Sequence, residues 1–272
     1  MRVTNNQSDE ELLQMHVTAS RHTVHWLAEN GQDWVPFIAA QALGDNIVMM
    51  NGGGDSMDRY VYPYSIMVNV NGERSADEGE DTRGRTYAKM GRAILAQPGG
   101  VAFQILDAKA RKLNLYPTNY AKATGAKANT LEILAEALDI NAQNFVKTVR
   151  EFNGAIQPGT IDPDRYKLDG KCTAGITPRK SNYTLSIDEP LFEGWAVRCG
   201  MTFTFGGMKV DAKTAQMQHV AGRAIPGLYA AGEMVGGLWV GNYASGSGMM
   251  AGATYGRIAG THAALVALAA LA

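Results

Sequence analysis

Hydrophobic and polar residues recur along the chain with periods that predict helices and short strands in mixed order. Residues 8–29 carry an apolar side at helical spacing, and Leu12 and His16 lie on it. Ser8 and Glu11 have the spacing of a capping box, in which each side chain satisfies a backbone N–H at the start of a helix. The chain is therefore expected to open with a helix that begins near Ser8.

A hairpin and a second helix are predicted next. Residues 64–70 have the composition of a strand and lead into Asn71-Gly72, a dipeptide that favours tight hairpin turns. Residues 86–97 return to helical spacing, and Pro98-Gly99-Gly100 stops the pattern. Residues 101–106 have the composition of a buried strand.

Two amphipathic helices and a glycine-rich end follow. Asn129 is placed to cap a helix over residues 131–138, and Asn141 to cap the helix after it. Residues 153–190 are rich in turn-forming residues, which predicts a long surface excursion. Short strands are then expected at residues 195–201, 202–205, 208–211 and 227–231. A last helix is expected from about residue 248 to the C-terminus.

Composition excludes several classes of protein. The chain has 272 residues and a net charge of −1, which argues against a nucleic-acid-binding surface and a polybasic membrane surface. Its start lacks the apolar segment of a secretory signal, and the apolar stretch at residues 263–272 is too short to span a bilayer. Two cysteines, Cys172 and Cys199, favour a reducing compartment, so a cytoplasmic location without a membrane span or metal site is expected.

Glycine is the compositional outlier, at 31 of 272 residues, or about 11% against about 7% in typical proteins. The glycines that indicate a function lie in residues 225–248. There a short apolar strand ends at Glu233, and a glycine-dense loop leads into the last helix. Glycines let a ligand approach the backbone, and a helix N-terminus offers unpaired N–H donors and a positive dipole end. This pattern favours a ligand site, although a tight strand-to-helix turn with a solvated Glu233 would need the same residues.

The same segment resembles the C-terminal flavin-binding segment of the fumarate reductase/succinate dehydrogenase flavoprotein family. The likeness is carried by Gly227-Leu228-Tyr229-Ala230-Ala231-Gly232-Glu233, by Gly236-Gly237 and Asn242, and by Gly206-Gly207-Met208-Lys209-Val210-Asp211 before them. Further upstream, Asn69, Gly72, Arg74, Glu78 and Thr82-Arg83 resemble the family's capping domain. The amino-acid sequence of residues 87–95 and 180–182 is most similar to that of the tricarballylate dehydrogenase branch.

This resemblance implies a function and a set of roles. It implies an α+β fold, FAD as cofactor, and oxidation or reduction of a carbon–carbon bond next to a carboxylate or carbonyl. Glu233 matches the residue that binds the flavin ribityl hydroxyls, and Ser247 and Gly248 match the backbone that faces the flavin pyrimidine edge, with Asn242 beside them. Arg83 matches the arginine that exchanges a proton with the substrate carbon. Since an arginine pKa exceeds about 12, such a role needs help from nearby acids such as Glu78, Glu80 or Asp81.

The chain also departs from the family pattern. Tyr243 replaces the family's substrate-binding arginine, and Thr202 and Thr204 lie where a histidine is expected. Losing a bidentate carboxylate clamp weakens the case for a dicarboxylate substrate. Tyr243 also resembles a tyrosine of ketosteroid dehydrogenases, which faces a carbonyl. Tyr243, Thr202 and Thr204 are therefore the candidates for holding a substrate oxygen.

The dinucleotide-binding pattern Gly-x-Gly-x-x-Gly after a strand is missing from the sequence. The resemblance therefore divides the chain into a helical remnant of the FAD-binding domain at residues 1–50, a capping domain at 51–195, and the C-terminal segment of the FAD-binding domain at 196–272. Expected partners are a small carboxylate or carbonyl substrate and an unknown electron acceptor. A second chain that supplies the nucleotide-binding half is a further expectation. The rival interpretation is a non-catalytic fragment that binds no FAD alone.

Overall fold

The computed structural model describes residues 7–30, 50–51, 61–115, 125–162, 167–200 and 204–272. It divides into two compact units. Unit 1 comprises Met1–Asp45 and Phe203–Ala272, and unit 2 comprises Asn46–Thr202. Helices and strands are mixed in both units, so the α+β fold expected from the sequence is confirmed.

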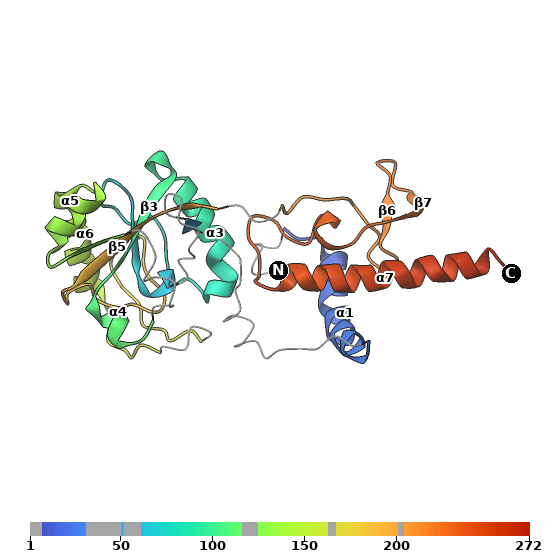
Figure 1. Ribbon diagram of the computed structural model, residues 1–272, viewed down its shortest axis with the longest axis horizontal. Helices are drawn as coiled ribbons and strands as arrows, with labels where there is room; N and C mark the ends of the chain where they lie inside the picture. The colour runs from blue at the N-terminus through green and yellow to red at the C-terminus, as the bar shows by residue number, and fades with distance from the viewer. Residues whose placement is uncertain (1–6, 31–49, 52–60, 116–124, 163–166, 201–203) are drawn as a thin grey trace. The chain divides into compact units, whose positions relative to one another are not determined.

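Unit 2 is built on an antiparallel sheet in the order β1-β5-β3-β2, with β4 also paired to β5 (Figure 1). Its strands are β1 (Met50–Asn51), β2 (Ile66–Val68), β3 (Val101–Leu106), β4 (Ala126–Ala128) and β5 (Phe192–Cys199). Its helices are η2 (Tyr62–Tyr64), α3 (Arg83–Leu95), η3 (Pro98–Gly100), α4 (Ala108–Lys112), α5 (Leu131–Leu138) and α6 (Ala142–Ala155).

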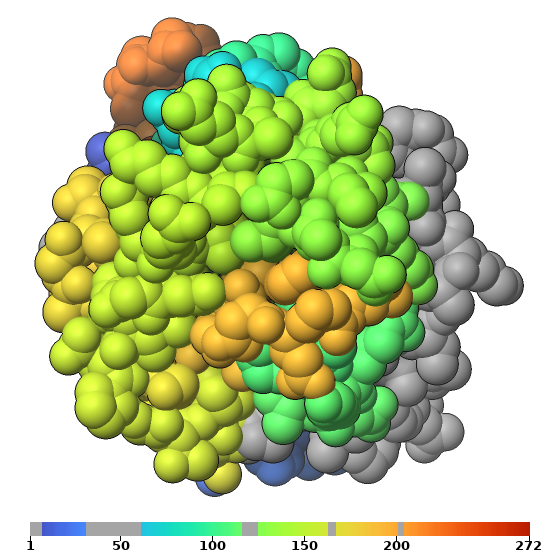
Figure 2. Space-filling view, turned by 90° about the vertical axis from the view of Figure 1, so that its left-hand side faces the viewer, coloured from blue at the N-terminus to red at the C-terminus, as the bar shows by residue number. Residues whose placement is uncertain are grey.

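Both faces of this sheet are covered. Because side chains alternate along a strand, Phe103 and Ile105 of β3 point to the face that α5 and α6 cover, where they join Phe145 and Phe152 in one apolar core. The yellow-green segment that carries α5 and α6 forms much of the surface seen in Figure 2. The other face carries Trp195 of β5, and α3 packs against β5 and β3. A sheet covered on both faces explains why β3 is apolar almost throughout.

Unit 1 contains two long helices and a small hairpin. Its elements are α1 (Glu10–Glu29), β6 (Gln216–Gln218), β7 (Ala224–Tyr229), η5 (Gly232–Met234) and α7 (Ser247–Ala269). α1 packs against α7, and the buried Tyr255 hydroxyl donates to the carbonyl of Leu12 at 2.7 Å. The start of α1 is tied to the glycine loop, because Asp9 N–H donates to the carbonyl of Gly237 at 2.8 Å.

Several sequence predictions are confirmed by these elements. The strand at residues 101–106 and the helix at residues 131–138 have the predicted bounds. Asn141 caps α6, since its side chain accepts from Asn144 N–H. The hairpin turn after β2 is also present, and Gly72 adopts a φ of 77°, which is the left-handed region that favours glycine.

Other local predictions are wrong. Asp9, not Ser8, caps α1, and Thr130, not Asn129, caps α5. The predicted strand over residues 208–211 is reduced to isolated bridges at Met208 and Val210. The described part of the strand predicted at residues 202–205, which is residues 204–205, is not extended into a strand. The roles assigned to residues 1–50, 51–195 and 196–272 stay predictions.

Candidate functional site

The strand–loop–helix segment that carried the chemical signal lies in unit 1. β7 pairs with β6 in an antiparallel hairpin, with Gln216 opposite Tyr229, and the chain then turns through η5. Gly232 has a φ of 67° and Gly246, the residue before α7, has a φ of 80°. Both turns require the left-handed conformation that glycine adopts without a steric penalty. The loop is therefore shaped by its own backbone before any ligand is considered.

Glu233 lies on the surface of this loop. One carboxylate oxygen, Oε1, accepts from the backbone N–H of Thr204 at 2.8 Å and from the Thr204 hydroxyl at 3.2 Å. Among the described residues, the other oxygen has no hydrogen-bond partner. The structure thus brings together Glu233, predicted to bind cofactor, and Thr204, predicted to bind substrate. An exposed carboxylate fixed at one oxygen is suited to accept hydrogen bonds from ligand hydroxyls at the other.

Tyr243 and Gly248 are also brought together. The Tyr243 hydroxyl oxygen accepts from the N–H of Gly248 at 2.8 Å, so a tyrosine predicted to hold substrate satisfies a donor at the start of α7. The tyrosine ring is buried, with its centroid 5.2 Å from that of Trp239 and 6.1 Å from that of Phe205. Ser247 donates through its hydroxyl to the carbonyl of Ala244 at 2.5 Å. The sequence indicated these residues but not that they bind one another.

One pair of glycines in unit 1, Gly207 and Gly236, serves backbone packing. A Cβ at Gly207 would lie 2.5 Å from the carbonyl oxygen of Met234, and a Cβ at Gly236 would lie 2.7 Å from the carbonyl oxygen of Gly207. Met208 N–H donates to Met234 at 2.6 Å, which holds the two segments in contact. Close approach of two chain segments therefore explains Gly207 and Gly236. By contrast, nothing lies within 4 Å of a Cβ built on Gly206.

Two predicted site residues of the sequence, Asn242 and Thr202, remain to be placed. Asn242 is half-buried, just before Tyr243. Thr202 lies outside the described residues. Within the described ranges, no three histidine, cysteine or acidic side chains gather in a way that would hold a metal ion. No helix in the same ranges combines the length and apolar character needed to cross a membrane.

Arg83 belongs to unit 2, where it is the first residue of α3. It is buried, and its backbone carbonyl accepts from the Tyr62 hydroxyl at 3.4 Å. Tyr62 also shares a 2.5 Å hydrogen bond with Thr86, and burial raises the pKa of its hydroxyl well above the ordinary value. Tyr62 therefore remains protonated at neutral pH and fixes the first turn of α3.

The acids expected to assist Arg83 each have another basic partner. Glu78 pairs with Arg74, Glu80 with Lys89, and Asp81 with Arg85. Asp81 also accepts from the N–H of Thr82 at 2.7 Å, which holds the backbone just before Arg83. The acids thus shape the loop that carries Arg83.

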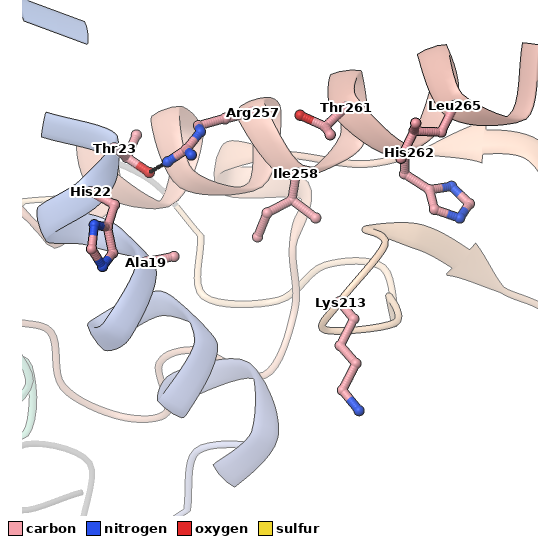
Figure 3. A pocket seen from close by; sticks show the side chains of 9 residues that line it. All are labelled: Ala19, His22, Thr23, Lys213, Arg257, Ile258, Thr261, His262 and Leu265. Atoms are coloured by element: carbon pink, nitrogen blue, oxygen red, sulfur yellow. Dashed lines mark hydrogen bonds between the residues drawn. The ribbon is translucent and has the colours of Figure 1, made fainter. Parts of the chain in front are cut away.

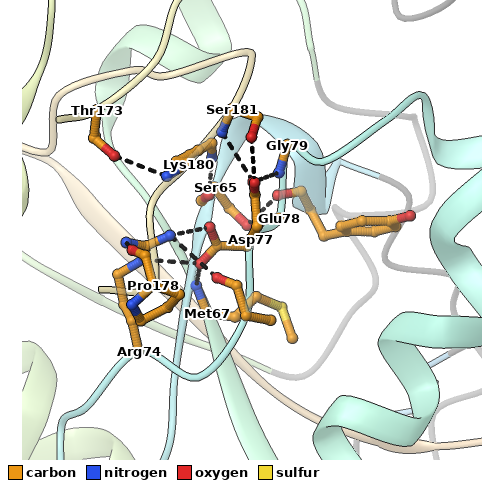
Figure 4. A network of polar contacts seen from close by, with 12 residues as sticks. Ser65, Met67, Arg74, Asp77, Glu78, Gly79, Thr173, Pro178, Lys180 and Ser181 are labelled. Atoms are coloured by element: carbon orange, nitrogen blue, oxygen red, sulfur yellow. Dashed lines mark hydrogen bonds and ion pairs between the residues drawn. The ribbon is translucent and has the colours of Figure 1, made fainter. Parts of the chain in front are cut away.

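A buried polar network in unit 2 has Glu78 at its centre (Figure 4). Glu78 accepts from Met67 N–H at 2.8 Å and from two guanidinium nitrogens of Arg74 at 3.1 and 2.5 Å. Burial raises the pKa of the Glu78 carboxyl, but Arg74 and Lys180 outweigh it and hold that pKa below its usual range. Glu78 is therefore ionised at neutral pH although its side chain is fully buried.

Lys180 completes this network. Its ammonium donates to the carbonyl of Ser65, its backbone N–H donates to the Thr173 hydroxyl at 2.7 Å, and the side chain is fully buried. Burial lowers its pKa to about 8, against the opposing effect of Glu78. Sequence reasoning noted Lys180 only as part of a likeness to one branch and missed its ion-pair environment. Lys180 lies about 100 positions from Arg74 and Glu78 in sequence, so no local pattern indicates that it belongs to their network.

The family model described as FAD binding domain matches residues 61–249. An NADH:acrylate oxidoreductase of Vibrio harveyi is 29% identical over 206 residues, which are 73% of this chain and 18% of that protein.

Two solved structures are also similar. The open conformation of a flavocytochrome c3 fumarate reductase is 27% identical with a TM-score of 0.54, covering 80% of this chain and 36% of that one. A 3-ketosteroid-Δ4-(5α)-dehydrogenase from Rhodococcus jostii RHA1, in complex with 4-androstene-3,17-dione, is 26% identical with a TM-score of 0.57, covering 84% and 44%. The chain therefore spans less than half of each of these three proteins.

Proposed function

The chain belongs to the FAD-binding domain family, and on that premise we propose that it takes part in an FAD-dependent oxidation or reduction of a carbon–carbon bond next to a carboxylate or carbonyl. The observation that carries the proposal is the segment from Gly227 to Gly248, which places an exposed carboxylate and a helix N-terminus at the two ends of one glycine loop. A cytoplasmic location is part of the proposal and agrees with the two free cysteines.

The residues present fit the flavin half of FAD. Glu233 exposes a carboxylate oxygen that suits the ribityl hydroxyls, and Gly206 and Gly246 leave open space where a side chain would stand. Ser247 and Gly248 would face the pyrimidine edge, where the positive end of α7 favours negative charge. When bound, FAD supplies the hydride acceptor or donor for this class of reaction.

Arg83 is the proposed proton-exchanging residue at the substrate carbon. Its support is the match to the family's Thr-Arg pair and its burial at the start of α3. A buried guanidinium is a weak acid, so the site must exclude water for this exchange to compete. Arg85, two residues further along α3 and about half exposed, provides a matched control because it has the same charge without the burial.

Tyr243 and Thr204 are the proposed contacts to a substrate oxygen, and Thr202 joins them by its place in the sequence. A phenol that accepts a hydrogen bond at its oxygen retains an O–H to donate, and accepting from Gly248 N–H strengthens that donation. A tyrosine in this place suits a carbonyl better than a dicarboxylate. The likeness to the 3-ketosteroid dehydrogenase supports this second candidate substrate class.

For a carboxylate substrate, the proposed subfamily is the tricarballylate dehydrogenase branch. The support is the sequence similarity of residues 87–95 and 180–182. The chain's part in the reaction is proposed either as autonomous or as joined to a further polypeptide that supplies the nucleotide-binding half.

Turnover by the FAD-loaded chain tests the proposal. The chain would be loaded with FAD, freed of excess by gel filtration, and assayed with a reduced viologen donor against fumarate, acrylate and an unsaturated 3-ketosteroid. Arg83→Gln should lose at least about 100-fold in turnover, in the range of general acid–base catalysis, while Arg85→Gln keeps wild-type activity and both keep the flavin absorption. Full turnover by Arg83→Gln would remove Arg83 from the mechanism.

If the chain is colourless and FAD cannot load it, a reconstitution experiment separates the rival interpretations. Adding the nucleotide-binding part of a relative as a separate polypeptide should then restore flavin absorption if two polypeptides form the site. Failure of that addition as well would favour the non-catalytic fragment.

A further inference from the structure

A cavity of about 350 Å³ lies in unit 1 between α1, α7 and the loop before β6 (Figure 3). It is separate from the glycine loop. Its lining on α7 starts at Arg257, nine residues after Gly248, and a rise of about 1.5 Å per residue puts the two about 14 Å apart along the helix. No role in the proposed oxidoreductase site uses this cavity.

Basic and imidazole side chains surround the cavity. His22 comes from α1, Lys213 from the loop, and Arg257 and His262 from α7 (Figure 3). Among the described residues that line it, none is acidic. The nearest carboxylate in sequence, Asp211, is held by Lys213 N–H at 3.0 Å and by Thr214, so its charge is engaged in its own turn. The cavity therefore presents a positive potential to solvent.

Two of these groups are oriented by their surroundings. Arg257 donates to the Thr23 hydroxyl at 3.4 Å, and its guanidinium lies 5.8 Å from the centre of the Trp26 ring. The Nδ1 atom of His262 shares a 2.9 Å hydrogen bond with the Tyr229 hydroxyl. That bond leaves Nε2 as the ring atom with which His262 can meet a ligand. Orienting such groups in advance lowers the entropy lost on binding.

The rest of the lining is apolar. Ala19 of α1 and Ile258 and Leu265 of α7 line the same space, and Ile258 projects into it from the helix (Figure 3). A purely inorganic anion would leave this surface in contact with water. A ligand with a charged head and an apolar body would satisfy both parts of the lining.

We propose that this cavity binds a small organic anion, with a carboxylate or phosphate head toward the basic side chains and an apolar body against Ile258 and Leu265. Binding at this cavity requires neither FAD nor the proposed reaction, so it is tested separately from them. Carboxylates and phosphate monoesters share the chemistry that the cavity recognises, and matched probes distinguish them.

Calorimetric titration of the full chain tests the proposal with two pairs of probes. Benzoate is compared with benzyl alcohol, and AMP with adenosine, so that each pair differs in its charged head. At least one anion should bind more than tenfold more tightly than its neutral partner. The pair with the larger ratio identifies the head group. If neither anion binds more tightly than its neutral partner, the proposal is overturned.

Charge-removal variants locate the binding. Lys213→Gln, at an exposed position, and Arg257→Gln should each weaken anion binding roughly fivefold, as expected for one partly screened charge. Arg223→Gln is the matched control, because Arg223 is an exposed arginine of the same unit in the turn between β6 and β7, outside the cavity. Lys213→Gln keeps the test decisive if Arg257→Gln folds poorly. Equal weakening by Arg223→Gln, or none by Lys213→Gln, would contradict the assigned site.

Discussion

The two units use their polar residues in opposite ways. In unit 2, the side chains of Glu78, Arg74 and Lys180 are almost fully buried; Glu78 pairs with Arg74, and the Lys180 ammonium donates to the carbonyl of Ser65. In unit 1, Glu233 is exposed, and the glycine loop around it has open space at Gly206 and Gly246. Buried, paired charges fix a structure, whereas an exposed carboxylate beside a helix N-terminus is available to a ligand. The comparison indicates that the Glu78 network of unit 2 is structural, whereas the exposed Glu233 of unit 1 is available to a cofactor.

Apolar residues are placed differently in the sheet core of unit 2 and at the end of α7. Phe103, Phe145 and Phe152 of unit 2 are buried in one core. The last turns of α7 in unit 1 leave Leu265 at 60% and Leu268 at 64% of full exposure. The two faces of the comparison are therefore a continuous core beneath β3 and α6 and a helix end whose leucines are exposed.

Removing Glu78 should have the largest effect. Glu78→Ala leaves Arg74 and Lys180 buried without their carboxylate, which should lower the free energy of unfolding by about 3–5 kcal/mol. Glu80→Ala is the control, because Glu80 and Lys89 are both about half exposed, and it should cost less than about 1 kcal/mol. Urea denaturation followed by circular dichroism measures both. Equal losses would contradict the structural role of the buried network.

A neighbouring pair of glycines tests the packing of unit 1. Gly207→Ala forces a Cβ against the carbonyl oxygen of Met234 and should cost about 1–3 kcal/mol, whereas Gly206→Ala has open space and should stay within about 0.5 kcal/mol of wild type. Thermal denaturation of the two variants provides the comparison. A larger loss from Gly206→Ala would show that the glycine loop is packed differently.

Lys180 predicts a pH dependence. Its folded pKa of about 8 lies below the ordinary 10.5, so between these values the unfolded chain holds a proton that the folded chain has released. Stability contributed by this residue therefore rises with pH through that interval, and the cost of burying its charge is fully present below pH 8. Denaturation at pH 7.5 and pH 10 should show wild type gaining stability relative to Lys180→Met. A constant or decreasing difference would contradict this prediction.

The smallest effect is expected at the start of α7. Tyr243→Phe keeps the ring against Trp239 and removes only the acceptor for Gly248 N–H, so it should cost about 0.5–1.5 kcal/mol. Hydrogen exchange at the Gly248 amide should become faster while exchange at Tyr255, two turns along the helix, stays unchanged. Unchanged protection at Gly248 would mean that the hydroxyl does not hold this amide.

Sequence reasoning located elements whose signals are local. Residues 101–106 and 131–138 were predicted with the right bounds because strand composition and helical spacing act over a few residues. The cap of α1 was misplaced because the Ser8 hydroxyl donates to the carbonyl of Leu238, 230 positions away, which leaves the capping role to Asp9. No pattern near Ser8 carries that information.

The candidate site also combines features that local sequence predicts with contacts that it does not predict. Glu233 and the glycine loop were found because a strand, a turn and a helix follow one another in sequence. The contacts of Glu233 with Thr204 and of Gly207 with Gly236 each join residues 29 positions apart, and only the folded chain reveals them. Backbone packing thereby explains part of the glycine excess that suggested a ligand. The residues that still indicate a ligand site are Glu233, Gly246 and the start of α7.

FAD titration followed by flavin fluorescence most directly tests the claim that this loop of unit 1 is a flavin site. Wild type should show saturable quenching, Glu233→Gln should bind about tenfold more weakly because a charged acceptor is lost, and Glu29→Gln, an exposed glutamate of the same unit, should match wild type. Equal affinity of Glu233→Gln and wild type, or no binding by wild type even after the nucleotide-binding part of a relative is added, would contradict the claim.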